Sequence, residues 1–499
     1  MTPAFLRALM LAAVVMLAAA LRLYHLENPI LDHPAWRQGD EASIARNFAQ
    51  LQNNIAYPQT DYDGPPPNYV ELELQIVPYL AAQAYRHFGV HETIGRLITV
   101  AFSLSTVVLL YALGAAIFSP RAGLLAAFLF AVAPSAVYYG RTFTPESTMI
   151  CFSTGVLLFW WRWLERRHWS DFALAVFFGA LAWLAKPPAL VVAAPLIAMT
   201  FSRVGRRAIA DISLYVFFAL TLVPFFLYFS HVSQIAEWHW ASGITNKHVL
   251  PALRAEFASA SALGHGLQSA LALLRMLTTT VLGPTLFTIS LVGLFALPRD
   301  PRRPGRGWMF GVWLAALAAY SFVVANVERV DYYLILFVPF SVLVAGGAID
   351  NVWRRLQPEA GVSKAAAAGL AAAAFVVGYT DMLEIHPYYT WSRPVYSAAK
   401  ELDRKLAPDA LIVMGHYDPA VLYTIGRKGW EEDALAWDVH DMTSAIAKGA
   451  RYFIAVEVPR FRANAALYRF MRRYRMVSVS SGWQVYDTRH FARSLGNRK

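Results

Sequence analysis

Apolar runs alternate with shorter polar stretches along most of this chain. Most of the runs are about 20 residues long, the length of α-helix that crosses the hydrocarbon core of a bilayer. A closed β-barrel would instead show short segments in which apolar and polar residues alternate. The pattern therefore predicts a polytopic α-helical membrane protein with about 11 spans. The runs lie at 4–24, 94–117, 121–139, 146–163, 171–185, 187–202, 208–229, 279–298, 307–326, 332–350 and 365–384.

Two connections between the runs are long, at 25–93 and 230–278. They contain "DEASIARNFAQL", "ELELQIVPYLAAQAYRHFG" and "LGHGLQSALALLRML", whose spacing of apolar residues predicts helices that lie at the membrane surface. We expect these loops to belong to a transmembrane domain that spans residues 1–387.

The pattern changes from about residue 388 onward. "ALIVMG", "RYFIAVEV" and "MVSVSSGWQVYD" are typical of strands, and "YSAAKELDRKL" and "DMTSAIAKGA" between them are typical of helices. This alternation predicts a small α/β domain over residues 388–499.

Charge sets the predicted orientation. The net charge is +11, and the Lys and Arg residues gather on every second connection. Cytoplasmic loops carry this excess, so the N-terminus is predicted in the cytoplasm and the C-terminal domain on the outer side of the membrane. The short outer connections carry only Arg141, Lys186 and Arg329. Because the membrane accounts for much of the positive charge, we expect no nucleic-acid partner.

An acid pair, Asp40 and Glu41 in "WRQGDEAS", follows the first run. The first turn of a helix or a solvated loop would explain the pair without any function. Alternatively, an aspartate held ionised at the outer face could act as a general base or a metal ligand. Asp63 precedes three prolines in "YDGPPPNYVE", which either stiffen the loop or hold this carboxylate in a fixed place.

The outer cations are candidates for phosphate contacts. Arg141 in "GRTFTPES" and Lys186 in "WLAKPPAL" could bind a phosphate or merely anchor lipid headgroups. Tyr332 and Tyr333 belong either to the aromatic belt of the membrane or, with Arg329, to a site for a lipid-linked phosphate.

The sequence contains few other residues or motifs that would indicate a bound metal or cofactor. The single cysteine, Cys151, excludes an internal disulfide and a cysteine-clustered metal site. His239 in "EWHWAS" is either an interfacial anchor or a contact to metal or phosphate. No nucleotide-binding motif is present. A transferase acting outside the cell would therefore need an activated donor carried in the membrane.

Several motifs in order, "GDEASIARNF", "DGPPPNYVELELQIVPYL", "GRTFTPES", "WLAKPPAL" and "DYYLILFVPF", resemble bacterial members of the protein mannosyltransferase and aminoarabinose transferase family. This family belongs to the GT-C glycosyltransferases, and the resemblance covers residues 1–350. It implies transfer of a sugar, with inversion, from a polyprenyl-phosphate donor at the periplasmic face. It also implies the site residues: Asp40 as the catalytic base with Glu41 as its helper, and Arg141, Lys186, Tyr332 and Tyr333 as contacts to the donor phosphate.

One departure concerns the acceptor. Aminoarabinose transferases carry a Glu-Lys pair before the prolines, whereas this chain has Asp63-Gly64. The acceptor therefore stays open between lipid A of the lipopolysaccharide, an envelope glycan, a protein and a polyprenyl-linked glycan. A divalent metal ion bound by Asp63, together with His239, is a further candidate.

Two other functions fit the same pattern. A transporter or flippase for a lipid-linked sugar would use the same basic contacts but would need no base. An oligosaccharide ligase or polymerase would share the topology and differ in the size of the donor.

Overall fold

The computed structural model describes residues 2–236, 249–257, 260–297, 305–327, 329–356, 378–379, 382–477, 479 and 481–492. Contacts divide the chain into two compact units. The first unit comprises 1–26, 96–230 and 243–387, and the second comprises 27–95, 231–242 and 388–499.

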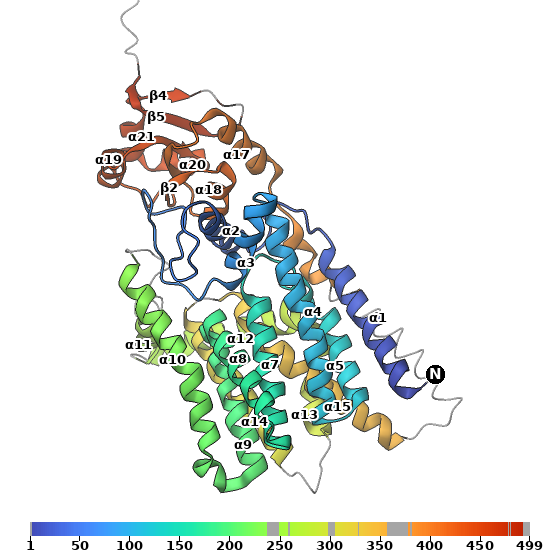
Figure 1. Ribbon diagram of the computed structural model, residues 1–499. Helices are drawn as coiled ribbons and strands as arrows, with labels where there is room; N and C mark the ends of the chain where they lie inside the picture. Colours follow the sequence, from blue (N-terminus) through green and yellow to red (C-terminus); the bar gives the residue numbers. More distant parts are fainter. Residues whose placement is uncertain are drawn as a thin grey trace, which may run out of the picture. The chain divides into compact units, whose positions relative to one another are not determined.

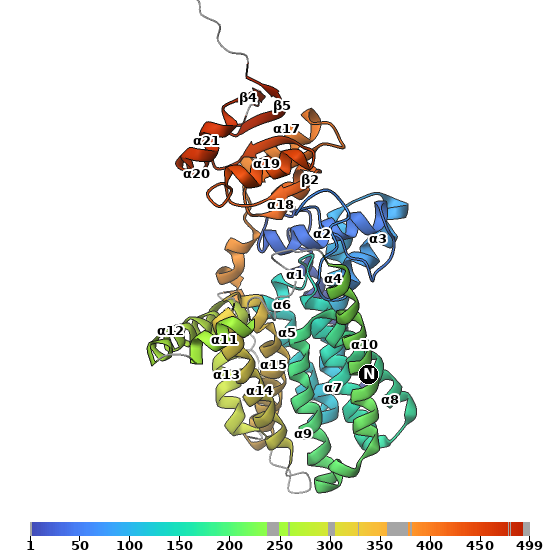
Figure 2. The same cartoon turned by 90° about the vertical axis from the view of Figure 1, so that its left-hand side faces the viewer.

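Helices make up the first unit (Figure 1). Its α-helices are α1 (Pro3–Leu23), α4 (Glu92–Ile117), α5 (Pro120–Val132), α6 (Pro134–Tyr138), α7 (Glu146–Arg166), α8 (Trp169–Ala185), α9 (Ala193–Val204), α10 (Ile212–Ile235), α11 (Leu250–Phe257), α12 (Ala260–Met276), α13 (Gly283–Ala296), α14 (Gly305–Val327) and α15 (Phe337–Leu356). Short turns of helix, η1 (Pro187–Val192), η2 (Gly205–Ala210), η4 (Leu277–Val281) and η5 (Asp331–Leu336), join some of them. The helices pack as a bundle in which α7 lies on α8, α5 on α15 and α9 on α14 (Figure 2).

Six helices among the described residues are long and apolar enough to cross a membrane, or seven if the pair Gly266–Val281 and Gly283–Ala296, bent by 110°, is one span. The prediction of a multi-span helical protein is therefore confirmed. The number of spans is smaller than the eleven apolar runs, partly because some runs form short helices. The run at 121–139 breaks at Pro134, since the residue before a proline is driven out of the helical conformation. The last predicted span, 365–384, lies mostly outside the described residues.

Small residues let these helices approach each other closely. A Cβ atom on Gly123 would lie 2.3 Å from the Tyr111 carbonyl oxygen, and one on Gly346 would lie 2.7 Å from the Ala122 carbonyl oxygen. Such contacts are typical of helix packing in membranes, where dispersion replaces the hydrophobic effect as the driving force.

The second unit combines the first long loop with the C-terminal segment. The loop contributes α2 (Ala35–Gln50) and α3 (Ile76–Phe88). The C-terminal segment contributes five strands, β1 (Leu411–Gly415), β2 (Lys428–Glu431), β3 (Ala450–Ala455), β4 (Tyr474–Val477) and β5 (Gln484–Phe491), in the order β2-β1-β3-β5-β4. Its helices and turns are η6 (His386–Tyr389), α17 (Arg393–Lys405), α18 (Pro419–Ile425), α19 (Val439–Ala447), α20 (Val458–Ala463) and α21 (Ala465–Met471).

The mixed sheet confirms the predicted α/β character of the C-terminal segment. Strand β1 is parallel to β2 and β3, whereas β5 is antiparallel to β3 and β4. The predicted strand at 476–487 in fact contains the end of β4 and the start of β5. Strand β2 was not predicted, because "KGWE" is only four residues long and contains a glycine.

The loop 27–95 groups by its contacts with residues 388–499, although the sequence suggested a boundary at residue 388. The reason is the close packing of α2 on α18, which both views show side by side (Figures 1 and 2). A Cβ atom on Gly39 would lie 2.5 Å from the backbone nitrogen of Ala420. Only glycine permits this approach, so Gly39 of the "GDE" stretch has a packing role.

Candidate functional site

Helix α2 carries the acid pair and is polar, yet most of its residues are buried. Asp40 and Glu41 lie in its second turn, since the helix begins at Ala35. The first-turn explanation of the pair therefore does not apply. The acids face protein, each being 1% exposed, so the solvated-loop explanation does not apply either.

One arginine serves three carboxylates around this pair. Arg37 Nη2 contacts Glu41 Oε1 at 2.8 Å and also forms a short ion pair with Glu73. Its Nη1 lies 3.9 Å from Asp40 Oδ2, which is too long for a direct hydrogen bond. Asp40 thus receives the smallest share of the positive charge of Arg37.

Burial raises the pKa of Asp40 to about 7. The charge of Arg37 and the hydroxyl of Tyr62 lower this pKa but do not offset the loss of solvation. Within the described part of the chain, neither carboxylate oxygen of Asp40 has a hydrogen bond of ordinary geometry. A carboxyl group with a pKa close to neutral is suited to accept a proton from a substrate hydroxyl.

The C-terminal segment adds two partly buried acids that the sequence analysis did not identify. Asp418 precedes α18, where its carboxylate accepts a hydrogen bond of 2.9 Å from Ala420 N. Its negative charge raises the pKa of Asp40, and burial raises its own pKa to about 6. Burial, followed by the charge of Asp40, raises the pKa of Glu431 well above its usual value.

The sequence alone indicates only one of these neighbours of the acid pair. Arg37 stands three and four residues before the acid pair, a helical spacing that indicates an ion pair. Asp418 and Glu431 are distant in the sequence, so only the packing of α2 on α18 reveals them.

Asp63 lies in the same unit at the tip of the proline-rich loop, with a positive φ of 72°. The next residue, Gly64, donates a backbone hydrogen bond of 2.7 Å to the Gly429 carbonyl, which ties the loop to β2. The described residues contain no group of three or more His, Cys, Asp and Glu side chains arranged to hold a metal ion. His239, the other predicted ligand, lies outside the described residues. The residues that can be described therefore do not supply a metal site.

A second cluster lies in the first unit around Lys186. Its ammonium forms a short, buried ion pair with Glu146 and lies 4.8 Å and 4.9 Å from the ring centroids of Tyr332 and Tyr333. Tyr139 donates a hydrogen bond of 2.6 Å to Asp331, at the start of η5. The structure thus brings Lys186 together with both predicted tyrosines. Lys186 itself is positioned by Pro187, because the residue before a proline adopts an extended conformation and ends α8.

The two predicted arginines lie in different surroundings within the same unit. Arg141 is fully buried, and its guanidinium donates a 2.8 Å hydrogen bond to the His25 carbonyl oxygen. It also lies 5.2 Å from the ring of Tyr138. Arg329 is exposed, and its Nε donates to the Ala325 carbonyl at 3.3 Å. These contacts give both arginines a structural role.

Part of the chain is similar to a known protein family. Residues 75–229 match the family described as dolichyl-phosphate-mannose-protein mannosyltransferase. This match does not include the acid pair. A search of curated proteins found no match.

Solved structures share the fold over the whole chain. ArnT from Cupriavidus metallidurans bound to undecaprenyl phosphate is 15% identical, with a TM-score of 0.60 and complete coverage of both chains. The apo state of that protein gives 16% identity and a TM-score of 0.57, covering 97% of this chain and 98% of ArnT. The Archaeoglobus fulgidus oligosaccharyltransferase AglB, in complex with an inhibitory peptide and a dolichol-phosphate, is 13% identical with a TM-score of 0.61. The match covers 97% of this chain and 74% of AglB.

These findings confirm the resemblance drawn from the sequence motifs. The fold of the chain is ArnT-like. The segment that matches the family, residues 75–229, begins at α3 and ends within α10. The chain is accordingly a multi-span membrane protein with an ArnT-like fold, and its residues 75–229 are similar to the dolichyl-phosphate-mannose-protein mannosyltransferase family.

Proposed function

We propose that this protein transfers a sugar from a polyprenyl-phosphate-linked donor to an acceptor at the periplasmic face of a bacterial inner membrane. The observation that supports this most strongly is Asp40, a buried carboxyl group whose pKa lies close to neutral. The protein in one similar structure is bound to undecaprenyl phosphate and that in another to a dolichol-phosphate, which supports a polyprenyl donor here as well.

The reaction is a single displacement at the anomeric carbon. Asp40 takes the proton of the acceptor hydroxyl while the hydroxyl oxygen forms a bond to C1 of the sugar. The bond between C1 and the phosphate oxygen breaks, and its electron pair leaves with the polyprenyl phosphate. Attack from the face opposite the leaving group inverts the configuration at C1.

Each cluster has its own task in this proposal. Arg37 keeps Asp40 and Glu41 in place, and Glu41 orients the base through this shared arginine. Lys186, with the hydroxyls of Tyr332 and Tyr333, binds the donor phosphate and stabilises the charge that develops on it. Arg141 and Arg329 are further candidates for this contact. No step is assigned to a metal ion, because the described residues supply no ligand set.

The decisive experiment measures sugar transfer by the purified protein in liposomes that contain polyprenyl-phosphate sugars. Asp40→Asn should lower turnover by roughly 10²–10⁴-fold, the usual contribution of a positioned base, and leave donor binding intact. Glu41→Gln should cost less. Glu457→Gln, which changes a half-exposed acid of the same unit, is the matched control. Normal transfer by Asp40→Asn would mean that the base lies elsewhere, with Asp63 the next candidate.

The same variant separates this function from a flippase, which moves its lipid without a base and makes no glycosidic bond. The remaining alternative is an oligosaccharide ligase or polymerase, which would use a larger donor. It stays open because the fold is as similar to an oligosaccharyltransferase as to ArnT. Mass spectrometry of lipids, envelope glycans and envelope proteins from a deletion strain and its parent would identify both sugar and acceptor. Loss of a single sugar from one class supports the proposal, and loss of a whole oligosaccharide favours a ligase.

A further inference from the structure

A cavity of about 950 Å³ lies within the second unit, and residues of both 27–95 and 388–499 line it. Its volume is in the range of sites that enclose a small molecule or several linked sugars. Asp40 and Glu41 are not among its lining residues. The mechanism above does not use this cavity.

Two fixed cations reach the cavity from one side. Asp61 is buried and accepts hydrogen bonds from Lys428 at 2.9 Å and from Asn47 at 3.1 Å. It also forms a short ion pair with Arg46. The side chains of Arg46 and Lys428 remain 16% and 22% exposed, and both line the cavity. Their donors are thus held in place before any ligand arrives.

A tyrosine and a glutamate supply an acceptor next to these donors. Tyr423 donates a hydrogen bond of 3.2 Å to Glu92, and the Arg46 guanidinium lies 4.5 Å from the centre of the Tyr423 ring. Both Tyr423 and Glu92 line the cavity. Donors and acceptors therefore lie together, as recognition of hydroxyl groups requires, since a hydroxyl both donates and accepts.

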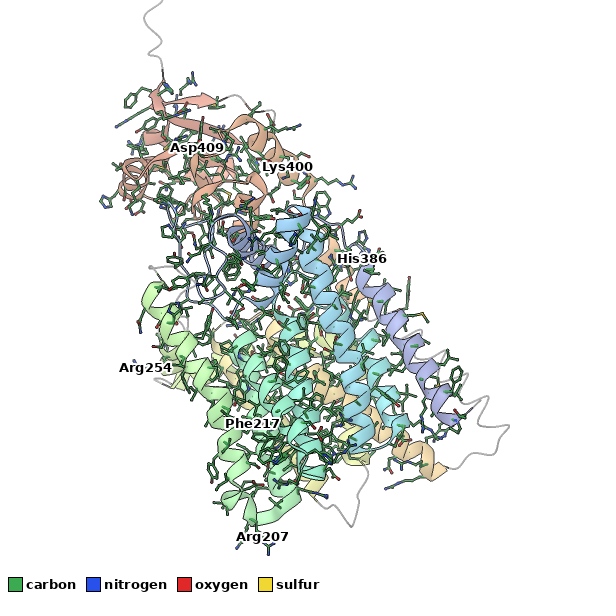
Figure 3. The ribbon with its side chains drawn as sticks, viewed as in Figure 1. Arg207, Phe217, Arg254, His386, Lys400 and Asp409 are labelled. Carbon is green, nitrogen blue, oxygen red and sulfur yellow. The ribbon has the colours of Figure 1, made fainter. Side chains whose placement is uncertain are left out.

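Aromatic side chains line the cavity where α17 begins. The rings of Trp391 and Tyr396 meet edge to face, with centroids 5.6 Å apart, and both side chains are partly exposed. Lys400 lies one helical turn further along α17, and Figure 3 labels it together with Asp409, another lining residue. An aromatic face packs against the C–H face of a sugar ring, so this side suits a saccharide.

Charge decides between a saccharide and an anion. The cavity is lined by four Lys and Arg side chains and four Asp and Glu side chains, so their formal charges cancel. Arg46 and Lys428 are already paired with Asp61, which leaves little attraction for a phosphate.

We propose that this cavity binds an uncharged oligosaccharide, a part of the acceptor glycan remote from the hydroxyl that reacts. The inference rests on the proposed sugar transfer and names its acceptor class. Asp40 and Arg46 are both on α2 but six residues apart, which separates them by about 9 Å along the axis and about 120° around it. The cavity thus holds the glycan away from the base and orients it.

The test uses the full chain labelled with 5-fluorotryptophan, in which Trp391→Phe assigns the ¹⁹F resonance of Trp391. Neutral linear trisaccharides of glucose, galactose, mannose and N-acetylglucosamine are titrated separately, and inorganic phosphate is the anionic probe. At least one trisaccharide should shift this resonance saturably, and phosphate should not. If no trisaccharide shifts it, or if phosphate shifts it at lower concentration, the proposal is overturned.

Variants give the second readout. Trp391→Ala and Tyr396→Ala should each weaken binding of the responding trisaccharide by roughly 2- to 10-fold, the contribution of one aromatic contact. Tyr417→Ala is the matched control, because Tyr417 is an exposed tyrosine of the same segment that does not line the cavity. Equal weakening by the control variant would contradict the assignment.

The outcome is separable from that of the proposed transfer. If sugar transfer depends on Asp40 but no trisaccharide shifts the Trp391 resonance, the cavity assignment is wrong and the proposed sugar transfer is still supported. If trisaccharides bind but Asp40→Asn changes no transfer, the transferase proposal fails instead. With both correct, Trp391→Ala raises KM for an oligosaccharide acceptor by a larger factor than it lowers kcat.

Discussion

At Asp40, burial and charge act on one carboxyl group in opposite directions. Removal from water favours the protonated form, whereas Arg37 at 3.9 Å favours the ionised form. Because Arg37 also pairs with Glu41 and Glu73, its effect on Asp40 is diluted. The residue is therefore poised to exchange a proton near neutral pH.

This balance predicts that Asp40→Asn stabilises the protein at alkaline pH. A pKa raised from 3.8 to about 7 means that the folded state binds a proton more tightly than the unfolded state. The contribution of Asp40 to the free energy of unfolding is greatest below about pH 4, falls as the pH rises towards 7, and stays low above it. Thermal melting at pH 5 and pH 8 should show a gain for the variant that is larger at pH 8. A variant less stable than the wild type at pH 8 would make Asp40 a structural residue.

The transfer rate of the wild type should follow the same titration. Only ionised Asp40 accepts a proton, so turnover should fall on the acid side with an apparent pKa near 7. Asp418→Asn removes a negative charge that raises the pKa of Asp40, so the acid limb should move to lower pH. A limb that does not move in this variant would show that Asp418 and the base do not interact.

Lys186 requires a paired test, since Glu146 is its buried partner. Removing the lysine alone would leave an uncompensated buried charge, at a cost of about 3–5 kcal/mol. The double variant Lys186→Met with Glu146→Gln removes both charges and should keep the fold. Its affinity for the donor should fall by about 1.5–3 kcal/mol, measured by binding of a polyprenyl-phosphate sugar. Unchanged donor affinity would make Lys186 and Glu146 a structural pair only.

At the scale of elements, the apolar runs predicted the helices well because lipid imposes a fixed length and composition. The break between the apolar runs 171–185 and 187–202 coincides with the end of α8 and the start of η1, since proline restricts the residue before it. The sequence could not show that α2 is buried. The spacing of its apolar residues suggested a helix at the membrane surface. Instead, Arg37 pairs with Glu73 of the loop before α3, and Asn47 accepts a hydrogen bond from Lys428 of the C-terminal segment.

The packing of α2 on α18 can be tested at Gly39. A Cβ atom there would lie 2.5 Å from Ala420 N and 2.6 Å from Ala420 Cα, so Gly39→Ala must push the helices apart. We expect a loss of about 1–3 kcal/mol in stability, as in other overpacked contacts, together with a fall in turnover. Ala420→Gly should not restore either property, because the clash is with backbone atoms. Gly311→Ala, at a position with no atom within 4 Å, is the control and should be tolerated.

For the whole molecule, the distribution of cations predicts the sidedness of the site. Lys and Arg residues gather on every second connection, which puts the N-terminus inside and residues 388–499 outside. The second unit includes both this segment and the acid pair, so one orientation places the candidate base and the glycan cavity in the periplasm together.

An alkaline phosphatase fused after Lys499 should be active, because this enzyme folds only outside the cytoplasm. A fusion after Arg303, in a connection predicted to be inside, should be inactive and serves as the matched control. The reverse result would place Asp40 in the cytoplasm, and the proposed transfer at the periplasmic face would then be wrong even if the chemistry of the site is right.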